Sequence, residues 1–389
     1  MSNPFIPLSV PSLKGNELRY VTKCIEEEWV SSVGEYVDRF EVEIARYLNC
    51  EFAIATMNGT AAIHLALILS DIGPDDEVIV PTITFVAPVN AIRYVNAYPV
   101  FMDCDDHLNI DIEKTTDFLK HHTIYRNNAV INKHTGRQIR AILPVHIFGH
   151  PVDPSLYELA KQYNLPVIED ATESLGSYYT NLDGAKRFSG TIGKFGCLSF
   201  NGNKLLTTGG GGMLLTNDPV FAKKAKYLTT QAKDDPLYFV HHEVGYNYRL
   251  TNVQAAIGVA QLEQIQYYLD AKKRNFILYQ EKLADLESLS LIHEPKWAIS
   301  NYWYYSLNVT SSPNNRDALM QYLKARKIDS RPLWHPQHLQ RPFSACYSHQ
   351  IEKALVYADQ ILNIPCSVSL SEQEVESVSD AIHSFYGHD

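Results

Sequence analysis

The pattern of hydrophobic and polar residues predicts an α/β protein. Between about residues 50 and 215, short apolar runs alternate with segments whose apolar residues recur at helical spacing. We expect strands over residues 53–56, 77–80, 100–102, 141–144, 167–169, 196–200 and 213–216. A helix is expected over residues 59–69, where Ile63, Ala66 and Leu67 share one face. This alternation is typical of a mostly parallel sheet with helices on both faces.

A second, smaller domain is expected after residue 250. Apolar residues there recur at i, i+3, i+4 and i+7, namely Val253, Ala256, Ile257 and Ala260. Thr251 or Asn252 is the expected N-cap of this long helix. We therefore predict a large domain with an N-terminal arm over residues 1–250, and a small α+β domain over residues 251–389. The small domain is expected to contain a strand at 304–309 and helices at 316–324 and 372–385.

The composition argues against several classes of protein. The 389 residues carry a net charge of -10 and contain no basic block, which argues against nucleic-acid binding. No run approaches the ~20 apolar residues of a membrane-spanning helix, and the first residues lack the pattern of a signal peptide. The six cysteines are scattered, and neither they nor the adjacent His241 and His242 have metal-ligand spacing. We expect a cytoplasmic protein with reduced thiols, no metal, and no nucleic-acid or membrane partner.

Lys204 is the residue that most directly suggests catalysis. It lies in a run of apolar and small residues and is followed by four consecutive glycines, Gly209 to Gly212. Such a turn lets the backbone approach a ligand closely and leaves the amine sterically free. A lysine held in this way can bind pyridoxal phosphate (PLP) covalently. The alternative is a surface lysine whose amine reaches solvent.

Asp170 is the expected partner of the PLP ring nitrogen. It follows the predicted strand at 167–169, at the edge where open α/β sheets bind ligands. A carboxylate there can keep a pyridinium nitrogen protonated. Glu173, three residues later, could hydrogen-bond the phenolic oxygen of the cofactor. Both residues also have a structural interpretation, as a helix N-cap and its capping-box partner.

A phosphate site is expected where a helix begins directly after a strand. Gly59, Thr60 and Ala61 occupy this position, and backbone N–H groups at a helix start bind phosphate. The same residues also make an ordinary helix start. Ser199 could add a hydroxyl to the phosphate or be only a strand-end serine. Phe85 follows another strand, where its ring could stack on the cofactor or pack in the core.

Together these motifs resemble the DegT/DnrJ/EryC1/StrS sugar aminotransferases, a PLP-dependent family of the aspartate aminotransferase superfamily. The likeness covers nearly the whole chain. Its segments are residues 6–9, 29–34, 58–62, 145–149, 169–171, 198–212 and 245–249. The resemblance implies fold type I, with a mixed, mostly parallel sheet between helices in the large domain and a small α+β C-terminal domain.

The resemblance also implies residue roles. Lys204 and Asp170 would be catalytic, and the cofactor would be held by Gly59, Thr60, Ala61, Phe85, Asp170, Glu173, Ser199, Lys204 and Asn247. Asn247 would reach the cofactor phosphate of the other subunit, so that a homodimer shares its active sites. Substrate contacts are expected from Ser31, Ser32, Arg249, Arg331 and His338. The alternative for these five is a polar domain-interface loop.

Two positions depart from the family pattern. The usual Thr-Thr-Gly-Glu-Gly-Gly has Gly210 in place of glutamate, and Glu173 stands where glutamine is frequent. Neither change removes a catalytic group. Lys204 stands where the sugar dehydratases of the family carry histidine, so the resemblance favours transamination.

The implied reaction moves the amino group of L-glutamate to the 4-keto group of a nucleotide-linked 4-keto-6-deoxy sugar. Residues 169–177 are similar to the branch that makes bacterial surface glycans of the bacillosamine and legionaminate type. The expected substrate is therefore UDP-2-acetamido-2,6-dideoxy-hexos-4-ulose. The nearest competing reaction is GDP-perosamine synthesis from GDP-4-keto-6-deoxymannose. A PLP-binding regulator without turnover, or a different fold type I enzyme such as an amino-acid lyase, would carry the same cofactor motifs.

Overall fold

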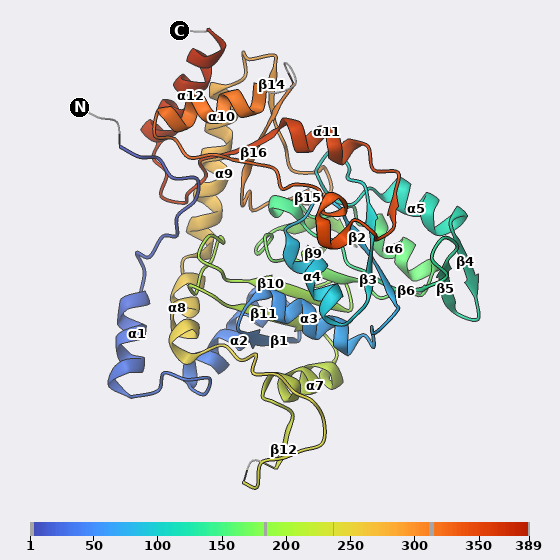
Figure 1. The fold of residues 1–389 in the computed structure, drawn as a ribbon. Helices are drawn as coiled ribbons and strands as arrows, with labels where there is room; N and C mark the ends of the chain where they lie inside the picture. The colour runs from blue at the N-terminus through green and yellow to red at the C-terminus, as the bar shows by residue number, and fades with distance from the viewer. Residues whose placement is uncertain (1–3, 183–184, 236, 311–314, 388–389) are drawn as a thin grey trace.

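The computed structural model describes residues 4–182, 185–235, 237–310 and 315–387. In Figure 1 the central sheet lies in the middle of the molecule, and the helices α9, α10 and α12 of the small domain lie above it. None of the helices within the described ranges has the length and apolar character needed to cross a membrane.

The large domain is built on two sheets that meet at β6 and β7. Their strand orders are β18-β3-β2-β6-β5-β4 and β1-β11-β10-β7, and bridges from Ile142 to Val167 and from Val145 to Asp170 join them. Among the central strands only β11 runs against its neighbours, so the predicted mostly parallel sheet is confirmed. The first group is β2 (Glu77–Pro81), β3 (Tyr98–Met102), β4 (Thr123–Arg126), β5 (Ala129–Asn132), β6 (Gln138–Ile142) and β18 (Ser348–His349). The second is β1 (Phe52–Thr56), β7 (Ile168–Asp170), β10 (Phe195–Ser199) and β11 (Gly212–Thr216).

All seven predicted strands are present, with small differences at their ends. The largest difference is in β6, which begins at Gln138 because its first half pairs antiparallel with β5. Three smaller β-pairings were not predicted: the β4–β5 hairpin, the sheet β15-β8-β9 and the β12–β13 hairpin. Their strands are β8 (Tyr178–Leu182), β9 (Ala185–Phe188), β12 (Lys233–Asp235), β13 (Val240–His241) and β15 (Ala298–Ile299).

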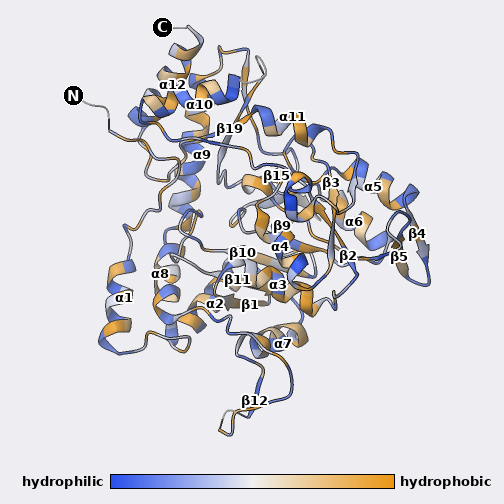
Figure 2. Ribbon diagram, viewed as in Figure 1, coloured by the Kyte–Doolittle hydropathy of each residue, from blue (hydrophilic) through white to orange (hydrophobic). Residues whose placement is uncertain are grey.

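Helices cover both faces of the central sheet because successive strand residues point to opposite sides. Ile54 of β1 faces the core under α3, whereas Ala53 and Ala55 face the core formed with α2 and α8. Figure 2 shows hydrophobic residues concentrated in the central strands and mixed with hydrophilic ones along the outer helices. The helices of this domain are α1 (Glu17–Glu26), α2 (Glu35–Leu48), α3 (Gly59–Leu69), α4 (Val86–Tyr94), α5 (Ile112–His121), α6 (Ser155–Gln162), α7 (Pro219–Thr229) and α8 (Asn252–Leu262).

The helix α3 has the predicted bounds but is buried on more than the predicted face. Ile63, Ala66 and Leu67 are buried, and so are residues on its other sides, including His64 and Leu65. The reason is that α3 lies between the sheet and the helices α4 and α7.

The small domain has a four-stranded antiparallel sheet of order β14-β16-β19-β17. Its elements are α9 (Ile265–Lys282), β14 (Leu289–Leu291), β16 (Tyr305–Val309), α10 (Asn315–Ala325), β17 (Arg331–Pro332), α11 (Lys353–Gln360), β19 (Ile361–Ile364) and α12 (Glu372–Tyr386). Short 3-10 helices occur at Ile147–Gly149, Gln337–Leu339 and Arg341–Phe343. The predicted strand at 304–309 and the two predicted helices of this region are therefore present.

The boundary after residue 250 stays a prediction. Thr251, one of the two expected residues, is the N-cap of α8, and it also forms a capping box with Gln254 that was not predicted. However, Ala256 and Val259 of α8 lie in the same core as Phe40 of α2. The N-terminal arm, which was predicted as part of the large domain, packs against the small domain. Ile6 pairs with Ile328, and the carbonyl of Leu8 accepts from the N–H of Cys366 at 2.7 Å.

Candidate active site

A cavity of about 350 Å³ lies where β7 and β10 end and α3 begins. Seven of the residues predicted to bind the cofactor line it: Gly59, Thr60, Phe85, Asp170, Glu173, Ser199 and Lys204. These residues are up to 145 positions apart in the sequence, counted from Gly59 to Lys204. The fold therefore brings the predicted amine, carboxylates and helix start into one chamber.

Lys204 presents its amine to this cavity. Its Nζ lies 3.5 Å from Oε1 of Glu173 and 3.8 Å from the ring centroid of Trp303, and 13% of its side chain is exposed. The loop is fixed from both sides: the Lys204 N–H donates to the carbonyl of Asn201 at 3.0 Å, and the Trp303 indole donates to the carbonyl of Asn203 at 2.8 Å. The alternative of a surface lysine is therefore wrong, since the amine is held and largely removed from water.

Asp170 is a buried carboxylate at the end of β7. Its Oδ1 accepts from the Thr172 N–H at 3.1 Å, and no helix follows it, so the N-cap interpretation is wrong. Burial raises its pKa, and the bonds to Thr172 and the charge of Lys204 oppose that effect. A buried anion of this kind is stabilised by a cationic N–H in the cavity, which is what a protonated pyridine nitrogen provides.

Glu173 lies beside the lysine, and it is not a capping-box residue. Its Oε2 accepts from the Phe148 N–H at 2.9 Å, and the Asn301 amide donates to its carbonyl at 2.9 Å. Burial raises the pKa of Glu173 to about 7, against the effects of Lys204 and the Phe148 N–H. Phe148 has φ 52°, a left-handed conformation that costs a phenylalanine about 1–3 kcal/mol. The bond to Glu173 thus holds a strained turn at the cavity wall.

The start of α3 supplies backbone N–H groups to the cavity. Asn58 caps the helix, since its Oδ1 accepts from the Ala61 N–H at 2.8 Å. The first-turn N–H groups of Gly59 and Thr60 have no partner within the helix and are the natural donors to an anion. Ala61 does not line the cavity, and its N–H is already bonded to Asn58.

Gly59 marks a close approach of two elements. A Cβ at this position would lie 2.9 Å from Cβ of Ser199 and 3.0 Å from Cγ2 of Thr172. The absence of a side chain therefore lets the helix start meet the end of β10. Ser199, which the sequence suggested as a further phosphate ligand, stands at this junction and lines the cavity.

Aromatic side chains form the remaining walls. Phe85 is 54% exposed and lies 6.1 Å from Trp334 between ring centroids, so it is not a core residue. Trp303 and Tyr304 stack on each other at 4.1 Å, and Phe148 packs against Trp334 at 4.9 Å. Trp303, Tyr304 and Trp334 were not predicted from the sequence. The dense aromatic run at 302–305 was the available signal.

The five predicted substrate residues do not line this cavity. Arg249 is 7% exposed and forms an ion pair with Glu41 at 2.9 Å, which leaves it a structural role within its own chain. Arg331 pairs with Asp329 at 2.6 Å. His338 Nδ1 lies 2.7 Å from the Thr82 hydroxyl.

The other two residues, Ser31 and Ser32, lie in the segment before α2. The carbonyl of Ser31 accepts from the Asn252 N–H at 2.6 Å. Asn247 also lies outside the cavity and is exposed, in a bridge with Thr230. None of these three residues lines the cavity of its own chain.

The chemistry of the cavity fits PLP. It offers a desolvated amine, a buried carboxylate, a helix start with free N–H groups, and an aromatic ring at its mouth. An aldehyde, a ring nitrogen, a phosphate and an aromatic face require these four partners respectively.

Comparison with known proteins identifies the family. The model of the DegT/DnrJ/EryC1/StrS aminotransferase family matches residues 11–383. The chain is 38% identical to the GDP-perosamine synthase of Caulobacter vibrioides, over 97% of this chain and 98% of that protein. It is 36% identical to the GDP-perosamine synthase of Escherichia coli O157:H7, over 98% and 99% of the two chains.

A solved structure supports the same assignment. The DegT/DnrJ/EryC1/StrS aminotransferase from Brucella abortus superposes with a TM-score of 0.86 at 28% identity, over 96% of this chain and 95% of that one. Fold type I and PLP as the cofactor, both predicted from the sequence, are thus confirmed. The chain belongs to the DegT/DnrJ/EryC1/StrS aminotransferase family and is a PLP-dependent nucleotide-sugar aminotransferase.

Proposed function

We propose that this enzyme transfers the amino group of L-glutamate to the 4-keto group of GDP-4-keto-6-deoxymannose, the reaction type of a GDP-perosamine synthase. The proposal rests on the similarity of this chain to two GDP-perosamine synthases, those of Caulobacter vibrioides and Escherichia coli O157:H7. In both comparisons the similarity covers nearly the full length of the two chains. The predicted cytoplasmic location belongs to this proposal and stays a prediction.

The relatives support this substrate better than the UDP-linked N-acetylhexosamine that the sequence favoured. The expectation of a UDP-linked sugar depended on residues 169–177. Ser174 and Ser177 are buried, and the Ser177 hydroxyl donates to the carbonyl of Gly149 at 2.7 Å. Other residues of the segment, Asp170, Thr172 and Glu173, line the cavity.

Lys204 and Asp170 are the proposed catalytic residues. PLP, when bound, supplies an electron sink for the carbanion that forms at the substrate carbon. Asp170 would hold the proton on the ring nitrogen through its buried carboxylate. Lys204 would bind the cofactor and, as a free amine, would move a proton at its Nζ. Glu173 would hydrogen-bond the phenolic side of the cofactor, and its Oε1, 3.5 Å from Nζ of Lys204, is close enough to orient the amine.

The remaining pocket residues position the cofactor in this proposal. Gly59 and Thr60 would donate their N–H groups to the phosphate, and the Ser199 hydroxyl lines the same cavity. Phe85 offers a ring face at the cavity mouth, where its exposure leaves room for stacking. Ala61 supports the helix start through its bond to Asn58 rather than binding the phosphate itself.

The substrate is tested by amination of a panel of nucleotide sugars. Purified holoenzyme is incubated with L-glutamate and with 4-keto-6-deoxy sugars linked to GDP, UDP or dTDP, and the product is identified by mass spectrometry and NMR. We expect the GDP-linked sugar to be aminated at carbon 4 with the highest kcat/KM. Preferential amination of the UDP-linked N-acetyl sugar would overturn the proposed substrate and restore the sequence-based one.

We also propose that the active sites are shared in a homodimer. The β12–β13 hairpin projects from the large domain in Figure 1 and carries exposed apolar residues, among them Leu237, Tyr238 and Phe239. Asn247 follows this hairpin and does not line the cavity of its own chain. Both features fit a second copy of the chain whose cofactor phosphate receives Asn247.

Subunit mixing tests this arrangement. Lys204→Ala and Asn247→Ala are each expected to be impaired, and co-refolding or co-expression of the two restores one intact site in each mixed dimer. Random reassortment then gives about one quarter of the wild-type activity. If mixed samples show only the sum of the separate variants, the sites are not shared.

A further inference from the structure

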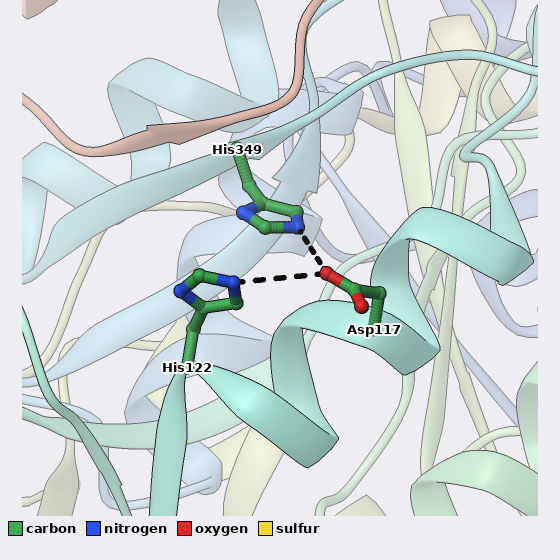
Figure 3. A group of neighbouring side chains, drawn as sticks. All are labelled: Asp117, His122 and His349. Carbon is green, nitrogen blue, oxygen red and sulfur yellow. Dashed lines mark hydrogen bonds and ion pairs between the residues drawn. The ribbon is translucent and has the colours of Figure 1, made fainter.

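A cluster of histidines lies away from the catalytic cavity, at the end of α5. Asp117 is in the last turns of α5, His122 is its C-cap residue, and His349 is in β18. Figure 3 shows the three side chains reaching toward one another from these separate elements. None of them lines the cavity that holds Lys204.

The three side chains offer ligand atoms at the spacing of a metal site. His349 Nε2 lies 3.1 Å from Oδ2 of Asp117, and His122 Nε2 lies 3.7 Å from the same oxygen. All three ligand atoms lie within 4.8 Å of one another. Tetrahedral ligands about 2.1 Å from a zinc ion are separated by about 3.4 Å, so a small movement of the rings closes the site.

Oδ2 of Asp117 is hydrogen-bonded to His349 Nε2 at 3.1 Å and accepts from the Gln350 amide at 3.3 Å, whereas His122 Nε2 lies 3.7 Å from it, beyond hydrogen-bond distance. His122 Nδ1 lies 3.0 Å from Nε2 of His134, so one of these rings donates to the other. If His122 donates, its Nε2 lone pair faces a carboxylate lone pair. If His134 donates, the His122 Nε2–H is 3.7 Å from the oxygen, which is too long for a hydrogen bond. A cation between the two groups satisfies both lone pairs in the first arrangement.

Neighbouring groups hold the ligand atoms in place. His134 fixes the far nitrogen of His122 and stacks on Tyr347 at 4.7 Å, while His121 Nδ1 lies 2.9 Å from the other oxygen of Asp117. Ligating histidines and carboxylates in metal sites are typically oriented by such outer contacts. His349 is buried, whereas Asp117 is 38% exposed and His122 33%, so the open side of the cluster can admit a water as fourth ligand.

We propose that His122, His349 and Asp117 form a binding site for a first-row divalent metal ion of the zinc class. Two imidazole nitrogens and one carboxylate oxygen suit Zn²⁺ and its neighbours rather than Mg²⁺ or Ca²⁺, which take oxygen ligands. His349 lies in β18 and His122 immediately precedes β4, and these strands are the two edges of the six-stranded sheet. The ion would therefore fasten the C-terminal segment that contains β18 to the α5 end of the large domain.

Isothermal titration of metal-stripped, tag-free holoenzyme with zinc chloride tests the site. We expect one site per chain, with affinity reduced about 10-fold or more in each of His122→Gln, His349→Gln and Asp117→Asn. His383→Gln is the matched control, because His383 also pairs with an aspartate, Asp285, at 3.0 Å and belongs to no such three-ligand group within the described chain. The control should bind zinc like the wild type.

A second measurement separates loss of the site from loss of the fold. Each variant should keep the cofactor absorbance and circular dichroism of the wild type, but lose the zinc-dependent rise in Tm that the wild type shows. For a variant that does not fold, zinc-edge anomalous diffraction of the wild type decides, with a peak expected about 2.0–2.2 Å from the three ligand atoms. Absence of zinc binding in the wild type, equal binding in the ligand variants, or an anomalous peak elsewhere would overturn the proposal.

Discussion

Glu173→Gln is the most informative perturbation of the active site because it changes a charge and preserves the shape. The carboxylate is buried beside Lys204, and its Oε2 accepts from the Phe148 N–H at 2.9 Å. Burial raises its pKa from 4.5 to about 7. A glutamine oxygen can accept the same N–H bond, so the substitution mainly removes the titrating charge.

The magnitude follows from linkage between protonation and folding. Because the folded-state pKa is raised, Glu173 disfavours the folded state increasingly as the pH rises from 4.5 through about 7. A shift of the Glu173 pKa from 4.5 to about 7 lowers the free energy of unfolding by at most about 3 kcal/mol once the pH exceeds both pKa values. About 2 kcal/mol of this develops between about pH 5.5 and about pH 8. Below pH 4.5 the wild-type carboxyl is neutral in both the folded and the unfolded state. The pH-dependent difference in stability between wild type and Glu173→Gln therefore vanishes there.

Urea unfolding of cofactor-free protein across this pH range measures the effect. The stability difference between Glu173→Gln and wild type should grow in favour of the variant as the pH rises. Glu287→Gln, at an exposed position of the small domain, is the control and should show no such trend. A difference that stays constant from about pH 5.5 to about pH 8 would show that Glu173 titrates normally and that the reasoning from burial is wrong.

Three further predictions concern the lysine and two glycines. Lys204→Ala should lower kcat by on the order of 10²–10⁴-fold from the acid–base role alone, measured as amination of the nucleotide sugar. Gly149→Ala should destabilise the protein by at least about 2 kcal/mol in urea unfolding, since φ is +96° and the new Cβ would lie 1.9 Å from Oδ1 of Asn301; an unchanged midpoint contradicts this. Gly210→Glu restores the residue usual in the family and should change stability by no more than about 0.5 kcal/mol, because the nearest atom to a Cβ there is Nε2 of Gln254 at 3.6 Å. Strong destabilisation by Gly210→Glu would show that the loop has closed around the missing side chain.

Local patterns predicted the elements that depend on local physics. The strands follow uninterrupted apolar runs, and α3 begins where Asn58 provides a cap, so their positions could be read from neighbouring residues. Asp170 could be identified because it stands at the end of a predicted strand. Lys204 could be identified because it lies in the turn that follows the strand ending at Ser199. The unpredicted β4–β5 and β8–β9 pairings occur in polar segments, where the alternation is weak.

Residues whose role depends on distant partners were missed or misjudged. Trp303 contacts the lysine loop through its indole bond to Asn203, 100 positions away, and through its ring, which lies 3.8 Å from Nζ of Lys204. Arg249 looked available for substrate but is paired with Glu41, 208 positions away. Neither partner can be inferred from spacing along the chain, because tertiary packing alone brings them together.

The pairing of β1 with β11, together with the packing of α8 against α2, has a consequence for biosynthesis. During translation, the strand at residues 52–56 leaves the ribosome long before its partner at residues 212–216, and residues 252–262 emerge later still. Until then one flank of the nascent sheet presents unsatisfied backbone groups and apolar surface. The growing polypeptide is therefore expected to be most prone to aggregation in this interval, and translational pauses before residue 262 should lower the yield of active enzyme.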